Sequence, residues 1–155
     1  MSRAPYIAVV GPEEATDGQL AAAEAVGRGL AQRGAVVVCG GLGGVMASAC
    51  EGAKAAGGTT VGILPGSDRA AANEWVDVAV STGLGEARNA LVVRAADAVV
   101  AVGGGYGTLS EIALALKAGK RVIGVDTWTL GREPDPIARV TDPDEAVAMA
   151  LAAVR

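Results

Sequence analysis

The sequence predicts a three-layer α/β fold, in which a mostly parallel sheet is covered by helices on both faces. Short β-rich apolar runs alternate with longer alanine-rich runs along the chain. Glycines follow the helical runs before the next strand begins, where helices commonly end. The run 98–102 is continuously apolar, which is typical of a central strand buried on both faces of a parallel sheet.

The first half of the chain predicts three strands and two helices. Gly34 stands where a helix commonly ends in a left-handed glycine, and the pair at 57–58 ends the second helix in the same way. Pro65 and Gly66 end the third strand. In order, we expect a strand at 6–10, a helix from Thr16 to about Arg33, a strand at 36–39, a helix that follows the loop 40–44 and ends near Ala56, and a strand at 60–64.

The second half predicts three more strands and three more helices. A proline at the first helical position and a Glu at the third mark the start of the last helix, at Asp142. Pro134 and Pro136 indicate an irregular loop before it. In order, we expect a loop at 66–74, a strand at 75–80, a helix at 86–96, a strand at 98–102, a helix at 108–118, a strand at 121–125, a loop at 126–141 and the last helix.

The composition limits the possible functions. With 155 residues, 51% hydrophobic and 19% charged, the chain predicts a single folded domain over 1–155. A net charge of −4 argues against a strongly basic nucleic-acid-binding surface, so we expect no nucleic-acid partner. The sequence has no histidine, which excludes histidine triads, histidine bases and histidine-ligated metals.

The sequence also indicates where the protein is located and whether it binds a metal. The two cysteines, Cys39 and Cys50, form no CxxC pair, so we expect neither a disulfide scaffold nor a metal site. No apolar run approaches the roughly 18 residues that a membrane span needs, and a strand begins almost at the N-terminus instead of a signal peptide. We therefore expect a cytoplasmic protein with no membrane partner.

The sharpest motif is the segment from Gly103 to Glu111, which reads GGGYGTLSE. Glycines let the backbone approach an anion closely, and the helix that follows directs free N–H groups and its positive dipole end toward that anion. The motif therefore predicts a phosphate site without a lysine. Its candidate binding residues are Gly104, Gly105, Tyr106, Gly107 and Thr108.

Two readings of Glu111 remain open from spacing alone. Thr108 and Glu111 stand three residues apart, as in a capping box that only stabilises a helix start. Alternatively, the carboxyl group faces the ligand. The glycine run is harder to explain as a simple turn, because a strand-to-helix turn needs one glycine and not four.

A second glycine-rich loop follows the strand at 36–39. Its glycines, Gly40, Gly41, Gly43 and Gly44, either bind phosphate or allow tight packing of a strand against a helix. Neither loop is a Walker A motif or a complete GxGxxG, and no GxSxG elbow is present. A conventional dinucleotide site and serine hydrolase chemistry therefore have no support.

Arg88 and Asn89 place a cation and an amide at the start of the helix predicted at 86–96. A guanidinium group can hold a phosphate or orient a substrate through paired hydrogen bonds. The alternative is a solvated Arg on an exposed helix face, which is the interpretation for Arg69 and Arg94. Trp75 and Trp128 are interpreted as packing residues or loop anchors.

Taken together, these residues resemble the Lonely Guy-like Rossmann superfamily, which includes phosphoribohydrolases, proteins once named lysine decarboxylases, and molybdenum-cofactor carriers. The family pattern PGGxGTxxE is similar to 103–111, with Gly103 in place of the proline. The segment 40–46 resembles the family's GGGxxGLM, and the family's Arg-Lys pair corresponds to Arg88 and Asn89. The chain lacks the Met-His that precedes this pair in phosphoribohydrolases, and it looks closer to a short branch near the carriers.

The resemblance implies a Rossmann-like fold and two functions of different classes. In the first, the protein hydrolyses the N-glycosidic bond of a nucleoside 5′-monophosphate, with Arg88 and Glu111 as catalytic residues and no cofactor. In the second, it binds or carries a nucleotide or molybdenum cofactor without turnover. A purely structural subunit is a third reading, and lysine decarboxylation has no evident lysine to support it.

The helix predicted at 108–118 is apolar on nearly every face. One face can pack on the sheet, and the remainder needs another cover. Members of the resembling family form dimers with shared active sites, so we expect at least a homodimer.

Overall fold

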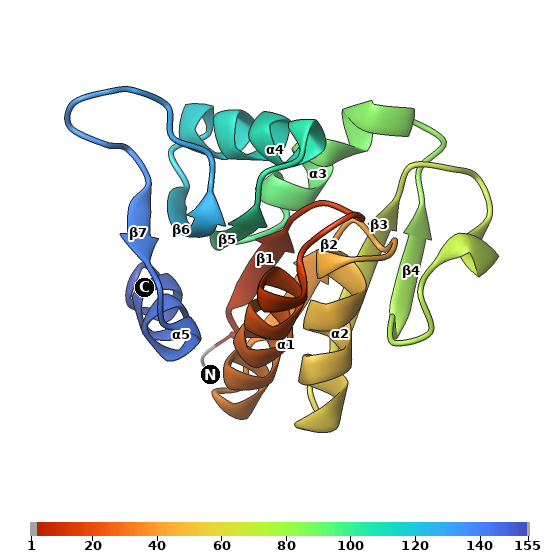
Figure 1. Ribbon diagram of the computed structural model, residues 1–155. Helices are drawn as coiled ribbons and strands as arrows, with labels where there is room; N and C mark the ends of the chain where they lie inside the picture. Colours follow the sequence, from red (N-terminus) through yellow and green to blue (C-terminus); the bar gives the residue numbers. More distant parts are fainter. Residues whose placement is uncertain (1–2, 155) are drawn as a thin grey trace.

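The computed structural model describes residues 3–154 as an α/β fold with five α-helices and a seven-stranded sheet (Figure 1). The strands are β1 (Tyr6–Val10), β2 (Val36–Cys39), β3 (Thr60–Leu64), β4 (Val78–Ser81), β5 (Ala98–Gly103), β6 (Arg121–Thr127) and β7 (Ala138–Val140). The helices are α1 (Asp17–Gln32), α2 (Val45–Ala55), α3 (Arg88–Arg94), α4 (Tyr106–Lys117) and α5 (Pro143–Ala152). Two short 3₁₀ turns, η1 (Arg69–Ala71) and η2 (Gly85–Ala87), lie in the loops before β4 and α3.

The strand order is β4-β3-β2-β1-β5-β6-β7, and every adjacent pair is parallel. The predicted fold class is therefore confirmed, and the sheet is parallel throughout. The chain builds outward from β1 to β4 and then returns to add β5 on the other side of β1. In sheets of this kind, the crevice at the carboxyl ends of the strands beside such a reversal is the usual place for a ligand.

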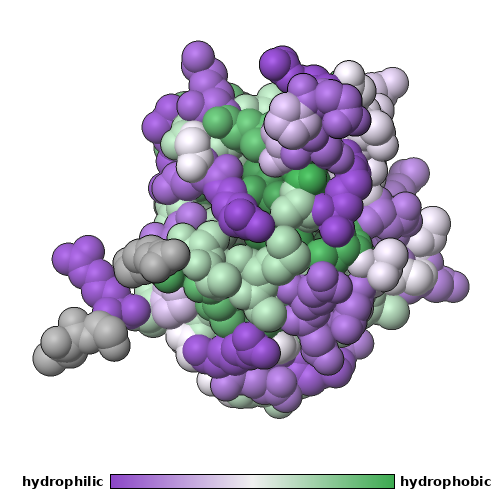
Figure 2. Space-filling view, turned by 90° about the vertical axis from the view of Figure 1, so that its left-hand side faces the viewer, coloured by the Kyte–Doolittle hydropathy of each residue, from purple (hydrophilic) through white to green (hydrophobic). Residues whose placement is uncertain are grey.

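Helices cover both faces of the sheet. Alternate residues of β1 point to opposite faces: Ile7 and Val9 pack with α1, α2 and α5, whereas Ala8 and Val10 pack with α3 and α4. Figure 1 shows these two layers on opposite sides of the sheet. Figure 2, viewed from the side that carries β7 and α5, shows hydrophilic side chains around a central apolar area.

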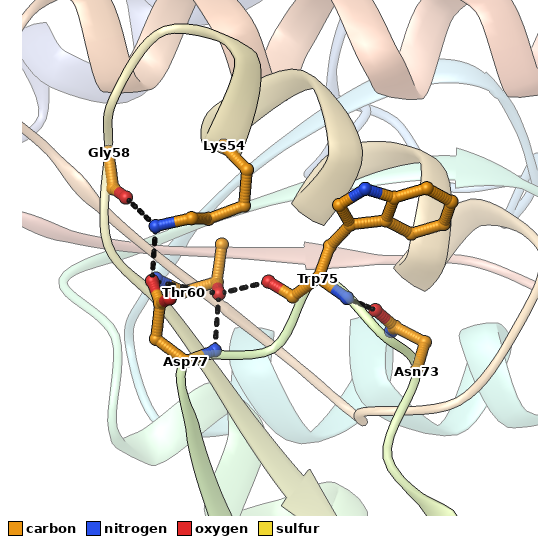
Figure 3. Close-up of polar contacts among 6 residues, drawn as sticks. All are labelled: Lys54, Gly58, Thr60, Asn73, Trp75 and Asp77. Carbon is orange, nitrogen blue, oxygen red and sulfur yellow. Dashed lines mark hydrogen bonds and ion pairs between the residues drawn. The ribbon is translucent and has the colours of Figure 1, made fainter.

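The predicted strand at 75–80 is shorter, because polar contacts hold its first residues in a turn (Figure 3). The hydroxyl of Thr60 donates to the carbonyl oxygen of Trp75 at 2.6 Å. The Asp77 carboxylate accepts from the Thr60 N–H at 3.0 Å and from Lys54 Nζ at 2.9 Å. The ladder with β3 therefore begins only at Val78.

Other predicted boundaries also differ from the structure. The loop expected at 126–141 contains β7, which has only three residues and gains its strand character from pairing with β6. The helix expected at 86–96 is a 3₁₀ turn over 85–87 followed by α3. The last helix begins at Asp142 as predicted, but the N-cap carboxylate accepts from the Asp144 N–H and not from that of Glu145.

Among residues 3–154, no helix combines the length and the apolar character needed to cross a bilayer.

Candidate functional site

A cavity of about 430 Å³ opens at the carboxyl edge of the sheet, beside the reversal between β1 and β5. Its walls come from the loops after β1, β2, β3 and β5 and from the first residues of α3 and α4. The volume lies in the range of small-molecule and cofactor sites. The loops that the sequence places at one edge of the sheet therefore do surround one space.

Helix α4 presents its N-terminus to this cavity. Its N-cap is Gly105, which offers no capping side chain, and Gly107 and Thr108 line the cavity from the first turn. The first N–H groups of a helix have no acceptor within the helix. The Thr108 hydroxyl is buried and has no hydrogen-bond partner in the described residues. Unpaired donors and a positive dipole end together favour an anion at this place.

Gly103 stands where the family pattern has proline, and its conformation explains the difference. Its φ is +80°, which proline cannot adopt. A Cβ at Gly103 would meet the Pro12 ring at 3.0 Å, as would a Cβ at Gly105. The loop after β5 is therefore held close to the loop after β1, and both line the cavity through Gly105 and Pro12.

Glu111 lies one turn after Thr108 and lines the same cavity, with only 7% of its surface exposed. Burial raises the pKa of its carboxyl group to about 8, and the positive charge of Arg88 opposes this shift. The capping-box reading of Glu111 is wrong, because the helix begins at Tyr106 and Thr108 is not the N-cap. Burial at this place therefore favours the neutral form of the carboxyl group.

Arg88 is buried, with 8% of its surface exposed. The alternative interpretation, that Arg88 is a solvated residue on an exposed helix face, is therefore wrong. Its Nε donates to the carbonyl oxygen of Ile63 at 2.9 Å, and its Nη2 donates to that of Gly40 at 3.3 Å. Its Nη1 donates to Asn89 Oδ1. The Asn89 amide in turn donates to Ser110 Oγ at 3.0 Å, which joins α3 to α4. Arg88 thus ties the ends of β2 and β3 to the start of α3.

Three of the four glycines after β2, Gly43 being the exception, make close contacts with their neighbours. A Cβ at Gly40 would lie 2.8 Å from Arg88 Nη2, and one at Gly41 would lie 2.6 Å from Leu64 Cδ2. Gly44 has a φ of +63°, and a Cβ there would lie 2.2 Å from the Glu13 carbonyl oxygen. These contacts favour the packing interpretation of this loop.

The profile of a family described as the SLOG cluster4 family matches residues 4–152. The chain belongs to this family. The predicted resemblance to the Lonely Guy-like and carrier-like Rossmann superfamily is thereby confirmed.

Several known proteins are similar to this SLOG cluster4 protein. An uncharacterized protein from Archaeoglobus fulgidus is 47% identical over 116 residues, which cover 75% of this chain and 76% of that protein. The molybdenum cofactor binding protein from Rippkaea orientalis is 39% identical, with a TM-score of 0.92 and 98% of each chain covered. The molybdenum cofactor carrier protein from Chlamydomonas reinhardtii is 36% identical, with a TM-score of 0.89, and covers 97% of this chain and 98% of its own.

Six of the twelve site residues predicted from the sequence of this SLOG cluster4 protein line the cavity. The glycines after β2, Gly104 of the loop after β5 and Tyr106 at the start of α4 lie outside its lining. The residues that line it are Arg88, Asn89, Gly105, Gly107, Thr108 and Glu111. Those outside it are Gly40, Gly41, Gly43, Gly44, Gly104 and Tyr106.

Tyr106 is 84% exposed beside the cavity mouth, and its ring lies 5.8 Å from that of Trp128. The Trp128 indole N–H donates to the Gly105 carbonyl oxygen at 2.9 Å. Trp128 therefore anchors the start of α4, and its fluorescence is placed to report on this end of the cavity.

Sequence reasoning missed several residues of the cavity wall. Glu13 and Glu86 bring carboxylates to its exposed rim, and Leu42 and Met46 bring apolar surface from the loop after β2 and from α2. Glu13 stands three residues after the end of β1, at the edge where ligands bind, and this position was the available signal. Glu86 carries no comparable signal, because it precedes α3 in an irregular turn.

Proposed function

We propose that this protein binds a phosphate-bearing ligand of the pterin or nucleotide class in the cavity and carries it without turnover. The observation that carries the proposal is the uncapped start of α4, where a buried Thr108 hydroxyl that has no partner among residues 3–154 faces a cavity of about 430 Å³. The similarity to proteins from Rippkaea orientalis and Chlamydomonas reinhardtii that bind or carry molybdenum cofactor supports this ligand class.

In this proposal the ligand spans the cavity from α4 to the acidic rim. Its phosphate accepts hydrogen bonds from the backbone of Gly107 and Thr108 and from the Thr108 hydroxyl. The carboxylates of Glu13 and Glu86 accept hydrogen bonds from ring N–H and amino groups, which pterins and purines both carry. Arg88 acts as a positioning residue, because it donates to three protein oxygens.

Hydrolysis of a nucleoside 5′-monophosphate is the second candidate, favoured by the presence of Arg88 and Glu111 in one cavity. That reaction develops positive charge on the sugar, which an ionised carboxylate stabilises. Burial keeps the pKa of Glu111 at about 8, so the neutral acid predominates at pH 7. A neutral carboxylic acid donates a hydrogen bond to a bound ligand and can also act as a general acid in glycoside cleavage, so the state of Glu111 is compatible with both candidates.

The first experiment identifies any small molecule that co-purifies with the protein, by mass spectrometry after denaturation. We expect an intact phosphate-bearing pterin or nucleotide. The protein is then incubated with AMP and with N6-substituted AMP. Release of free base and ribose 5-phosphate that is lost in Glu111→Gln would establish the hydrolase and overturn the carrier.

The affinity of the site is tested with the variant Thr108→Val. Trp75→Phe leaves Trp128 as the only tryptophan, so its fluorescence reports binding of the ligand identified above. We expect Thr108→Val to weaken binding by about tenfold, the effect of one lost hydrogen bond to a charged group. Thr141→Val, at an exposed Thr outside this cavity, is the matched control and leaves the affinity unchanged. Equal affinity of the two variants would contradict the phosphate role of α4.

We further propose that a second copy of the chain covers the layer of α3 and α4. Leu84, Leu91 and Tyr106 are 53%, 40% and 84% exposed on or beside these helices. Exposed large apolar side chains on one helical layer favour an interface there.

A further inference from the structure

The two cysteines of the chain face each other in the core. Cys39 is the last residue of β2, and Cys50 lies in α2. Their Sγ atoms are 3.5 Å apart, and neither residue is exposed to solvent. Since the chain has only these two cysteines, any chemistry that depends on a thiol is restricted to this place.

A third sulfur belongs to the same cluster. Met46 precedes Cys50 by four residues in α2, so the two side chains lie on the same face of the helix. Met46 belongs to the same buried cluster as the two cysteines and also lines the main cavity, with 7% of its surface exposed. The cluster is thus buried, but one of its sulfur residues reaches the cavity wall.

Although the spacing of the two cysteines in the sequence predicts no metal site, we propose that Cys39, Cys50 and Met46 form a binding site for a soft monovalent metal ion, Cu⁺. Two thiolates and a thioether are the ligands that this ion prefers over oxygen and nitrogen. Each thiol loses its proton as its sulfur binds the metal, and the ion stays in the same oxidation state. This site does not depend on the proposed ligand of the main cavity.

The spacing of the sulfurs suits a metal better than a disulfide. Metal–sulfur bonds of about 2.3 Å place two sulfurs of a trigonal site about 4 Å apart. The two Sγ atoms, at 3.5 Å, therefore need only a small separation. A disulfide would bring them to about 2.05 Å, would need an oxidant, and would leave Met46 without a role.

Two neighbours stabilise negative charge on the Cys39 sulfur, whereas the contact with Cys39 and burial raise the pKa of the Cys50 thiol. The Gly41 N–H donates to Cys39 Sγ at 3.3 Å, and the guanidinium of Arg88 lies behind the adjacent Gly40 carbonyl. Both stabilise negative charge on the sulfur. No cluster of three or more His, Cys, Asp or Glu side chains occurs within residues 3–154, so the third ligand at this site is the thioether of Met46.

Trp75 covers the cluster on another side. Its backbone is fixed by the Thr60 hydroxyl at 2.6 Å and by Asn73 Oδ1 at 3.0 Å (Figure 3). The indole packs against the cysteines and Met46. A metal ion therefore enters from the main cavity past Met46, and its binding is expected to change the fluorescence of Trp75.

The test is an anaerobic titration of the reduced, full-length protein with Cu⁺ in competition with a chromogenic Cu⁺ chelator. We expect one Cu⁺ per chain, with a loss of affinity of at least tenfold in Cys39→Ser and in Cys50→Ser. We expect a smaller loss in Met46→Leu. Met149→Leu, in α5, is the matched control and binds as the wild type does. In Trp128→Phe, the emission of Trp75 should fall in proportion to bound Cu⁺.

A second measurement needs no variant. X-ray absorption of the Cu⁺-loaded wild-type protein is expected to show a shell of sulfur atoms alone around the metal. A shell that contains nitrogen or oxygen would overturn the proposal. Failure of the wild type to compete for Cu⁺, or equal affinity in wild type and in folded cysteine variants, would overturn it as well.

Discussion

At the scale of single residues, Glu111 contributes to the pH dependence of the stability of the protein. Burial raises the pKa of its carboxyl group to about 8 from the ordinary value of 4.5. Between these two values the folded protein binds more protons than the unfolded chain, so its stability falls as the pH rises through this window. Below pH 4.5 both states carry the proton, and the contribution of Glu111 no longer changes with pH.

We therefore expect Glu111→Gln to stabilise the protein at pH 8, on the order of 2 kcal/mol, and to have little effect at pH 4.5. The amide resembles the neutral acid in shape and carries no buried charge. Thermal unfolding at several pH values measures the difference. Glu51→Gln, an exposed position in α2, is the control. Parallel pH profiles for wild type and Glu111→Gln would show that the carboxyl group titrates normally.

At the scale of secondary-structure elements, Arg88 joins α3 to the ends of β2 and β3. Removing its side chain leaves the carbonyl oxygens of Ile63 and Gly40 without their donor inside the protein. We expect Arg88→Ala to lower the free energy of unfolding by about 3 kcal/mol, measured by urea denaturation. Arg94→Ala, at the exposed end of the same helix, should change it by less than about 0.5 kcal/mol. Similar losses in both variants would contradict this role of Arg88.

The elements also show which features the sequence could predict. Periodicity and glycine placement predict the strand–helix alternation, because each strand and helix buries its own apolar face. The start of α4 was predicted at Thr108, since a Thr followed by Glu three residues later is a frequent helix start. In the structure, helix α4 begins at Tyr106, next to Gly105, whose carbonyl oxygen accepts a hydrogen bond from the Trp128 indole N–H. That contact joins residues 23 positions apart, and no local pattern reveals it.

The lining of the candidate site also depends on contacts between residues that are distant in sequence. The sequence brings the glycine-rich loops to one edge of the sheet, because the carboxyl ends of parallel strands lie together. It does not predict which side chains of those loops face inward. Gly40 and Gly44 make close contacts with neighbouring residues, whereas Leu42 and Met46 of the same segment line the cavity. Which residues of this segment line the cavity depends on neighbours from β3 and from the loop after β1, which are distant in sequence.

At the scale of the whole molecule, the two helical layers differ in how well they are covered. Three helices, α1, α2 and α5, pack on one face of the sheet, and only α3 and α4 pack on the other. We expect the wild type to be a dimer in light scattering at micromolar concentration, and Leu91→Glu to shift it toward the monomer by placing a charge in the interface. Ala21→Glu, at an exposed position of α1 in the opposite layer, is the matched control and should leave the dimer intact. A monomeric wild type would contradict the expectation, and dissociation by both variants would place the interface elsewhere. If Leu91→Glu is monomeric yet binds ligand as the wild type does, each copy holds its ligand alone. If the affinity falls as well, the second copy completes the cavity mouth beside Tyr106.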